Sequence, residues 1–268
     1  MHDIHTVALK AGLGFRPEST PDISTDEWVY TQLNSELSFK ALKTCTSELP
    51  VLTNWPSQFN FSLAERIQRM QAQERARLEI DMMSISDAER ALAHGRNWQK
   101  YQLRNYDQLK FFHSGTFDEA QIPFRLALFW FNHFTVGSSR NSLEYAGDYW
   151  QNTIAKNLRG TFKELLLDAI THPAMLSYLD NVSNIGENSI KSKGCRDADC
   201  VIGFNDNLAR ELLELHTLGS SFGYTEKDIR EAAKTLAGWG RIFHLEDDEE
   251  YQIRDFRRGY PAEDRLFL

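Results

Sequence analysis

The spacing of apolar and polar positions predicts helices along most of the chain. Apolar residues recur every three or four positions, the period of a helix with one buried face. Two short runs separated by acidic residues 246–250 instead predict a small hairpin over 241–254. We therefore predict an all-α, multi-helix globular domain spanning residues 1–268, with a small C-terminal β-hairpin.

Helix starts are marked by a Ser or Thr followed three positions later by Glu or Asp, the capping-box pattern. This pattern occurs at Ser62, Ser86, Thr116, Thr161 and Thr225. Helices are expected over 3–12, 26–44, 62–83, 86–112, 124–135, 141–157, 161–171 and 225–238. Pro123 should kink or restart the helix that Thr116 opens. Because residues 124–135 are apolar nearly all round, we expect a central core helix there. Pro173 fits the first position of a short helix.

Residues 205–219 read as one complete helix around which the rest of the chain is organised. Asp206 or Asn207 can cap its start, and Gly219 stands where a left-handed residue ends a helix. At 100° per residue one arc is polar and the other apolar. The polar arc holds Asn207, Arg210, Glu214 and Thr217, and the apolar arc holds Leu208, Ala209, Leu212, Leu213, Leu215 and His216.

His216 on the apolar arc has two interpretations. A buried histidine is usually satisfied by one backbone carbonyl or carboxylate. It can also belong to a metal or acid–base site together with Glu211 or Glu214. Glu211 and His216 are about 140° apart on the helix, so they cannot form the i,i+4 pair of a zincin, and any metal would need ligands from other helices.

Eight polar side chains on otherwise apolar helices are the candidate site. If they converge, they could act as acid–base partners or bind a divalent metal. The candidate catalytic residues are His216, Glu211, Glu214 and His133, and the candidate binding residues are Asn207, Arg210, His172 and Asp180. Separately buried pairs would instead support a structural role.

The 205–219 segment, Asn-Asp-Asn-Leu-Ala-Arg-Glu-Leu-Leu-Glu-Leu-His-Thr-Leu-Gly, resembles the signature of the bacterial domain of unknown function 1800 family. Residues 129–134, 172–181 and 223–239 match further family segments in the same order. The resemblance covers roughly residues 110–240. It implies a helical domain without an established activity.

The chain departs from the family pattern at two positions. Phe131 stands where the family often has a second histidine, and Asp206 replaces a glutamate. The first difference weakens a two-histidine ligand pair. Similar proteins are typically longer, with a further helical half, so we expect a short or truncated member.

Composition argues against several partner classes. The net charge is −8 and no Lys/Arg block stands alone, so nucleic acid is not an expected partner. No apolar window is long enough for a membrane span, and the N-terminus lacks a signal-peptide pattern, which predicts a cytoplasmic protein. The resemblance implies that export is also an option. Cys45, Cys195 and Cys200 are expected to be free thiols, although the last two could pair after export.

Two functions remain open at the level of sequence. Nucleotide-binding loops, a Gly-x-Ser-x-Gly elbow and His-Glu-x-x-His are absent. The favoured function is a scaffold or interaction protein with buried polar networks around the 205–219 segment, binding a protein partner or itself. The alternative is a metal- or His/Glu-dependent hydrolase with a cleft beside that helix.

Overall fold

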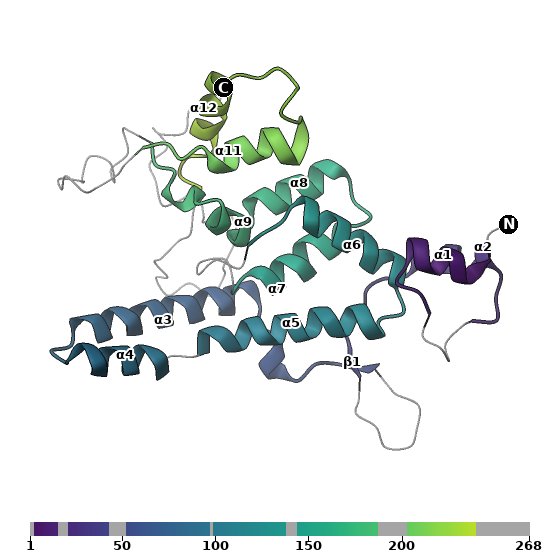
Figure 1. Cartoon of the computed structure of the whole chain (residues 1–268), viewed down its shortest axis with the longest axis horizontal. Helices are drawn as coiled ribbons and strands as arrows, with labels where there is room; N and C mark the ends of the chain where they lie inside the picture. Colours follow the sequence, from purple (N-terminus) through teal and green to yellow (C-terminus); the bar gives the residue numbers. More distant parts are fainter. Residues whose placement is uncertain are drawn as a thin grey trace. The chain divides into compact units, whose positions relative to one another are not determined.

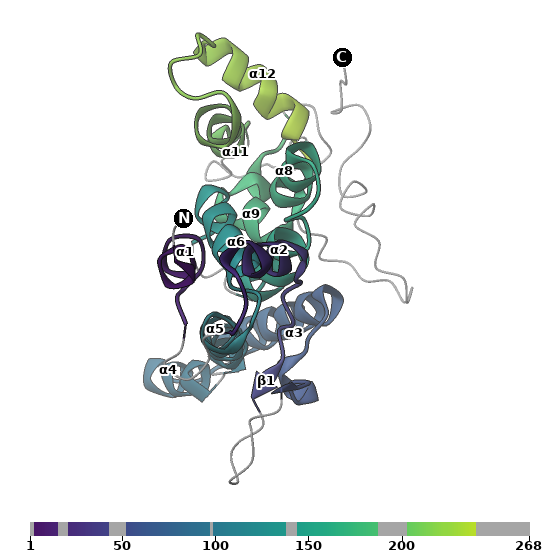
Figure 2. The ribbon, with the colours of Figure 1, turned by 90° about the vertical axis from the view of Figure 1, so that its right-hand side faces the viewer.

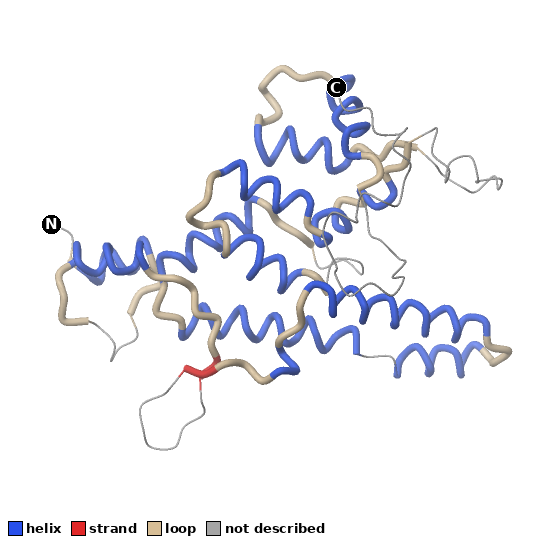
Figure 3. The backbone as a smooth tube through the Cα atoms, turned by 180° about the vertical axis from the view of Figure 1, so that it is seen from behind, coloured by secondary structure: helices blue, strands red, loops and turns tan. Residues whose placement is uncertain are grey.

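The computed structural model describes residues 3–15, 21–42, 52–96, 99–137, 144–186 and 203–239. Their regular secondary structure is almost entirely helical (Figures 1 and 3). The exception is a two-residue antiparallel pair of β1 (Ala41–Leu42) and β2 (Leu52–Thr53). The all-helical prediction is confirmed for this part of the chain. The predicted hairpin over 241–254 and all three cysteines lie outside the described residues.

The chain divides into two compact units, each described here by itself. The first contains residues 1–132 and 146–160, and the second contains residues 133–145 and 161–268. The prediction of a single domain stays a prediction. No described helix is both long and apolar enough to cross a membrane.

The first unit contains the N-terminal helices and a π-helical segment. In chain order its described helices are α1 (Ile4–Ala11), α2 (Thr25–Asn34), η1 (Ser57–Phe59), α3 (Leu63–Met82), α4 (Asp87–Arg96), α5 (Gln99–Phe117), α6 (Gln121–His133, whose last residue belongs to the second unit), α7 (Ala146–Asp148) and η2 (Tyr149–Ala155). Figure 1 shows α3 and α4 running side by side. The capping box at Ser62 is confirmed, and Ser86 likewise bonds with Glu89.

Helix α2 ends ten residues earlier than the predicted 26–44 helix. The carboxylate of Asp118 accepts hydrogen bonds from the backbone N–H groups of Ser38 at 2.7 Å and Phe39 at 3.3 Å. Phe39 has a φ of 47°, in the left-handed region that a bulky residue rarely adopts. A side chain therefore satisfies backbone groups that a continuing helix would have paired.

Thr116 does not open the next helix, contrary to the prediction. It lies inside α5, where its hydroxyl donates to the carbonyl of Phe112 at 2.8 Å. Asp118 accepts from the N–H of Ala120 at 3.1 Å, just before α6 begins. The Thr-x-x-Glu pattern was present, but Asp118 offered a stronger acceptor two residues later.

Trp150 is the centre of an aromatic cluster in the first unit. Its ring centroid lies 4.9 Å from that of Phe111, 5.5 Å from Phe124 and 5.4 Å from Phe131. These contacts pack α5 and α6 against η2. Helix α6 is only partly buried, however, because Phe129 is 58% exposed. The helix predicted to be a central core helix is therefore exposed on that face.

In the second unit the 205–219 segment packs against the helix that follows it. Its described helices are α8 (Phe162–Thr171), α9 (Pro173–Tyr178), η3 (Asn181–Ser183), α11 (Asn207–Glu211), η4 (Leu212–Thr217) and α12 (Glu226–Leu236). The capping boxes at Thr161 and Thr225 and the position of Pro173 are as predicted. Figure 2 shows α12 beside α11. Leu208, Ile229 and Ala233 are buried between these elements.

Candidate functional site

The start of the 205–219 segment is capped by a residue that the sequence did not single out. Asp206 occupies the cap position but makes no side-chain cap bond. The side-chain oxygen of Asn205 instead accepts from the N–H of Asn207 at 3.0 Å. An Asn side chain bonding two residues ahead is an Asx turn, which satisfies one of the free N–H groups at a helix start.

The end of the segment is formed as predicted. The N–H groups of Leu218 and Gly219 both donate to the carbonyl of Leu213 at 3.0 Å. Gly219 has a φ of 87°, in the left-handed region that glycine adopts without steric cost. These bonds stop the helix and turn the chain toward Phe222, whose N–H donates to the carbonyl of Gly219.

The middle of the segment is not a regular α-helix. After α11 the backbone becomes the π-helical η4, whose bonds span five residues instead of four. The rotation per residue is then smaller than the 100° assumed from the sequence. Leu208, Ala209 and His216 are buried as expected, but Leu215 is 64% exposed. The assignment of Leu215 to a buried arc is therefore wrong.

His216 is buried against aromatic rings. Its side chain is 5% exposed, and its ring centroid lies 5.2 Å from Phe134 and 6.1 Å from His133. Its Nδ1 atom has no hydrogen-bond partner among the described residues. Burial, and secondarily the charge of His133, lower the pKa of His216 from 6.5 to about 4. His216 is accordingly a neutral imidazole near pH 7.

His133 contacts the backbone of His216 rather than its ring nitrogens. Its Nε2 atom lies 3.1 Å from the carbonyl oxygen of His216. Since a carbonyl can only accept, His133 is the donor, which assigns the proton to Nε2. This bond joins His133, the first residue of the second unit, to η4, and it gives the carbonyl of His216 a side-chain donor.

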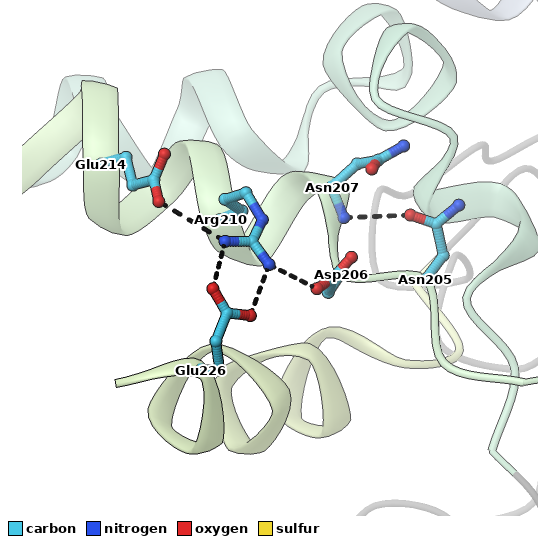
Figure 4. A network of polar contacts seen from close by, with 6 residues as sticks. All are labelled: Asn205, Asp206, Asn207, Arg210, Glu214 and Glu226. Atoms are coloured by element: carbon cyan, nitrogen blue, oxygen red, sulfur yellow. Dashed lines mark hydrogen bonds and ion pairs between the residues drawn. The ribbon is translucent and has the colours of Figure 1, made fainter. Parts of the chain in front are cut away.

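Arg210 is the centre of the polar face (Figure 4). Its guanidinium binds both carboxylate oxygens of Glu226, at 2.9 and 2.8 Å, from α11 to α12. It also lies 3.0 Å from Asp206 and 3.5 Å from Glu214, the i,i+4 pair that the sequence predicted. The hydrogen bonds from Arg210 lower the pKa of Glu226. One cation thus holds three carboxylates from two helices.

The remaining candidates occupy separate positions. Glu211 is half-buried, Asn207 is exposed, and Asp180 is exposed with a φ of 54°. His172 is the cap of α9, where its Nδ1 accepts from the N–H of Ala174 at 3.1 Å. The structure therefore brings His133 to His216 and Arg210 to Glu214. Within the described ranges no three His, Cys, Asp or Glu side chains gather closely enough to hold a metal ion.

A buried amide network beside the segment was not predicted from the sequence. Asn181 and Asn184 are each 1% exposed. The amide nitrogen of Asn181 donates to the carbonyls of Leu236 and Trp239 at 3.0 and 2.7 Å. These bonds fix η3 against the end of α12. Asn181 lies in the 172–181 segment that resembles the family, but its spacing in the sequence does not show whether its side chain is buried and hydrogen-bonded or lies in an exposed turn.

Asn184 continues this network to the 205–219 segment. Its amide nitrogen donates to Asn181 at 3.1 Å and to the carbonyl of Ala233 at 2.8 Å. Its oxygen accepts from the N–H of Asn205 at 3.1 Å. Because Asn205 in turn caps the segment, the two buried amides link η3, α12 and the start of α11.

Comparison with known proteins assigns a family and nothing more specific. A family model described as protein of unknown function (DUF1800) matches residues 6–262. No curated protein and no solved structure matches the chain.

Proposed function

The chain belongs to the family of proteins of unknown function DUF1800, and because that description assigns no activity, we propose a function from the geometry of the 205–219 segment. The protein is a scaffold that presents the end of this segment to a protein partner. Its polar side chains hold the surrounding helices, and its exposed apolar side chains make the contact.

One observation carries this proposal: the segment buries His216 and exposes Leu215. Burying an imidazole without a partner for Nδ1 costs free energy, whereas burying a leucine side chain would contribute about 2 kcal/mol. A helix selected only for stability would have the opposite orientation. The exposed leucine is therefore better explained by a contact outside the chain.

Leu215 belongs to a larger apolar surface, which we call the apolar ridge. It consists of Leu215, Leu218 and Phe222, which are 64%, 42% and 68% exposed. Leu215 lies in the π-helical η4, Leu218 is the residue that ends it, and the N–H of Phe222 bonds to the carbonyl of Gly219 just beyond. Large exposed apolar side chains that are close in the chain are candidates for an interaction surface.

The charges around the ridge indicate the class of partner. Residues 206–231 contain six carboxylates and three cations, and Arg210 is already bound to three of those carboxylates. A partner helix with one apolar face and basic flanking residues would match both the apolar ridge and this negative excess. A second copy of this acidic chain would match the charge less well.

The proposal is tested by binding to a defined partner. The wild-type chain, Leu215→Glu and Leu167→Glu are immobilised and exposed to an extract of the source cells, and each retained protein is purified and titrated. Leu167, 47% exposed on α8, provides a matched control. We expect one basic partner that binds wild type and Leu167→Glu equally and Leu215→Glu at least about tenfold more weakly. No saturating partner, or equal binding by Leu215→Glu, would overturn the proposal.

The hydrolase alternative has one supporting observation. The Nδ1 atom of His216 is buried without a partner, and a neutral imidazole can act as a base or a metal ligand. Elemental analysis of untagged protein and of His216→Ala distinguishes the two functions. Near-stoichiometric metal that the variant loses while remaining folded would favour the hydrolase. A metal-free protein that the substitution destabilises would favour the scaffold.

A further inference from the structure

The first unit contains a solvent-open cleft of 390 Å³, independent of the apolar ridge. This volume is within the range of small-molecule pockets, about 300–1,000 Å³. Its walls come from the end of α2 and the chain that follows it, the start of α6, and the end of η2. The apolar side chains that line it are Leu33, Leu37, Phe39, Ile122, Leu126 and Leu158.

Polar contacts hold the walls of this cleft together. The buried side chain of Gln32 donates to the carbonyl of Glu119 at 2.8 Å and accepts from the N–H of Ile122 at 3.2 Å. Arg159 donates to the carbonyl of Ser35 at 2.7 Å. Thus α2 is joined to α6 on one side and to the residues after η2 on the other, so the cleft is already formed without a ligand.

Two features of the lining are unusual for a structural surface. Leu33 and Leu126 remain 58% and 40% exposed although they face a concave site. Phe39 is held in its left-handed conformation by Asp118. Strained backbone of this kind persists where the surroundings enforce it and is concentrated at binding sites.

The charges of the lining residues identify the head group of a ligand. Lys156 and Arg159 both line the cleft, together with one carboxylate, Glu36. Arg159 lies 3.3 Å from Glu36, whereas Lys156 has no carboxylate partner among the described residues. The cleft therefore carries a local positive excess on a chain whose net charge is −8. An anion is the complementary ligand at this position.

From the apolar walls and the unpaired ammonium of Lys156, we propose that the cleft binds an amphiphile with one apolar chain and one carboxylate, such as a medium-chain fatty acid. The chain lies against Leu33 and Leu126, where it removes apolar surface from water. The carboxylate is bound by Lys156. No activity follows from this binding; it is a ligand site on the scaffold.

Isothermal titration calorimetry with decanoate, below its micelle concentration, tests this site. The wild-type chain should bind decanoate saturably at one site, and decyltrimethylammonium should not bind. Leu126→Glu and Lys156→Glu should each weaken decanoate binding at least about tenfold. Lys163→Glu, an exposed residue of α8 with the same charge change, should leave it unchanged.

Either variant, Leu126→Glu or Lys156→Glu, is sufficient to test decanoate binding in the cleft. Lys156 is exposed, so Lys156→Glu remains informative even if Leu126→Glu does not fold. The proposal would be overturned if decanoate does not bind saturably, if decyltrimethylammonium binds equally well, or if Lys156→Glu leaves the affinity for decanoate unchanged. Because Leu215→Glu does not touch this cleft, failure here leaves the proposed partner surface unaffected.

Discussion

The Nε2 atom of His133 lies 3.1 Å from the backbone carbonyl oxygen of His216, so two candidate catalytic histidines meet through a structural hydrogen bond. The ring of His216 is buried beside Phe134 and has no partner for Nδ1.

The burial of His216 predicts a loss of stability at mildly acidic pH. Its pKa is lowered from 6.5 to about 4 in the folded chain, so below pH 6.5 the unfolded chain binds a proton that the folded chain rejects. The contribution of neutral His216 to the free energy of unfolding is fully present above pH 6.5. It is lost as the pH falls toward 4, by about 3 kcal/mol in total. Urea unfolding at several pH values measures it. His216→Leu should remove this part of the pH dependence, and an unchanged dependence would contradict the account.

The buried amides predict a large cost for a small truncation. Asn184→Ala removes three hydrogen bonds and leaves Asn205 N–H and the Ala233 carbonyl without this partner. We expect the free energy of unfolding to fall by about 3 kcal/mol. Asn207→Ala, at the exposed first residue of α11, is the control and should change the free energy of unfolding by less than about 0.5 kcal/mol. Equal effects of the two substitutions would show that the network contributes little.

The first unit contains a buried ion pair with a similar prediction. Arg66 and Asp107, 2% and 8% exposed, are joined by two hydrogen bonds of 2.7 and 2.8 Å. A Cβ atom on Gly147 would collide with the Asp107 carboxylate, so this site is tightly packed. Arg66→Met alone should lower the free energy of unfolding by about 3–5 kcal/mol because it removes two charge-assisted hydrogen bonds from the buried carboxylate of Asp107. Adding Asp107→Leu should recover part of that loss, and additive losses in urea unfolding would contradict this explanation.

The exposed ion pairs of Arg210 predict a smaller and salt-dependent effect. Arg210→Lys keeps the charge but removes the bidentate contact with Glu226. We expect Arg210→Lys to melt at a lower temperature than the wild-type chain at low salt. The difference in melting temperature between the two should be smaller at high salt, because ions screen exposed charges. A difference that salt does not change would indicate that packing of the side chain, rather than charge, stabilises α11 against α12.

The sequence predicted those elements whose signals are local. The capping boxes at Ser62, Thr161 and Thr225 and the left-handed Gly219 depend on residues within four positions of each other. The early end of α2 could not be predicted, because the residues that follow it are bound by Asp118, some 80 residues away in sequence. Tertiary contacts of this kind override helical periodicity.

The candidate site was predicted only in part for the same reason. The pair of Arg210 and Glu214 followed from i,i+4 spacing, and it is present. The position of Leu215 was wrong because a π-helical turn changes the rotation per residue, which composition does not reveal. Asn181 and Asn184 were missed because their partners are backbone carbonyls of α12, more than 45 residues later.

The most direct test of the central claim is photo-crosslinking from the apolar ridge in the source cells. A photoreactive phenylalanine analogue replaces Leu215 in one variant and Leu167 in a second, and adducts are identified by mass spectrometry. The account predicts one discrete adduct with a basic partner at position 215, absent at position 167 and lost when Phe222→Glu is added. No discrete adduct at position 215, or the same adduct at both positions, would contradict the assignment of the apolar ridge as the functional surface.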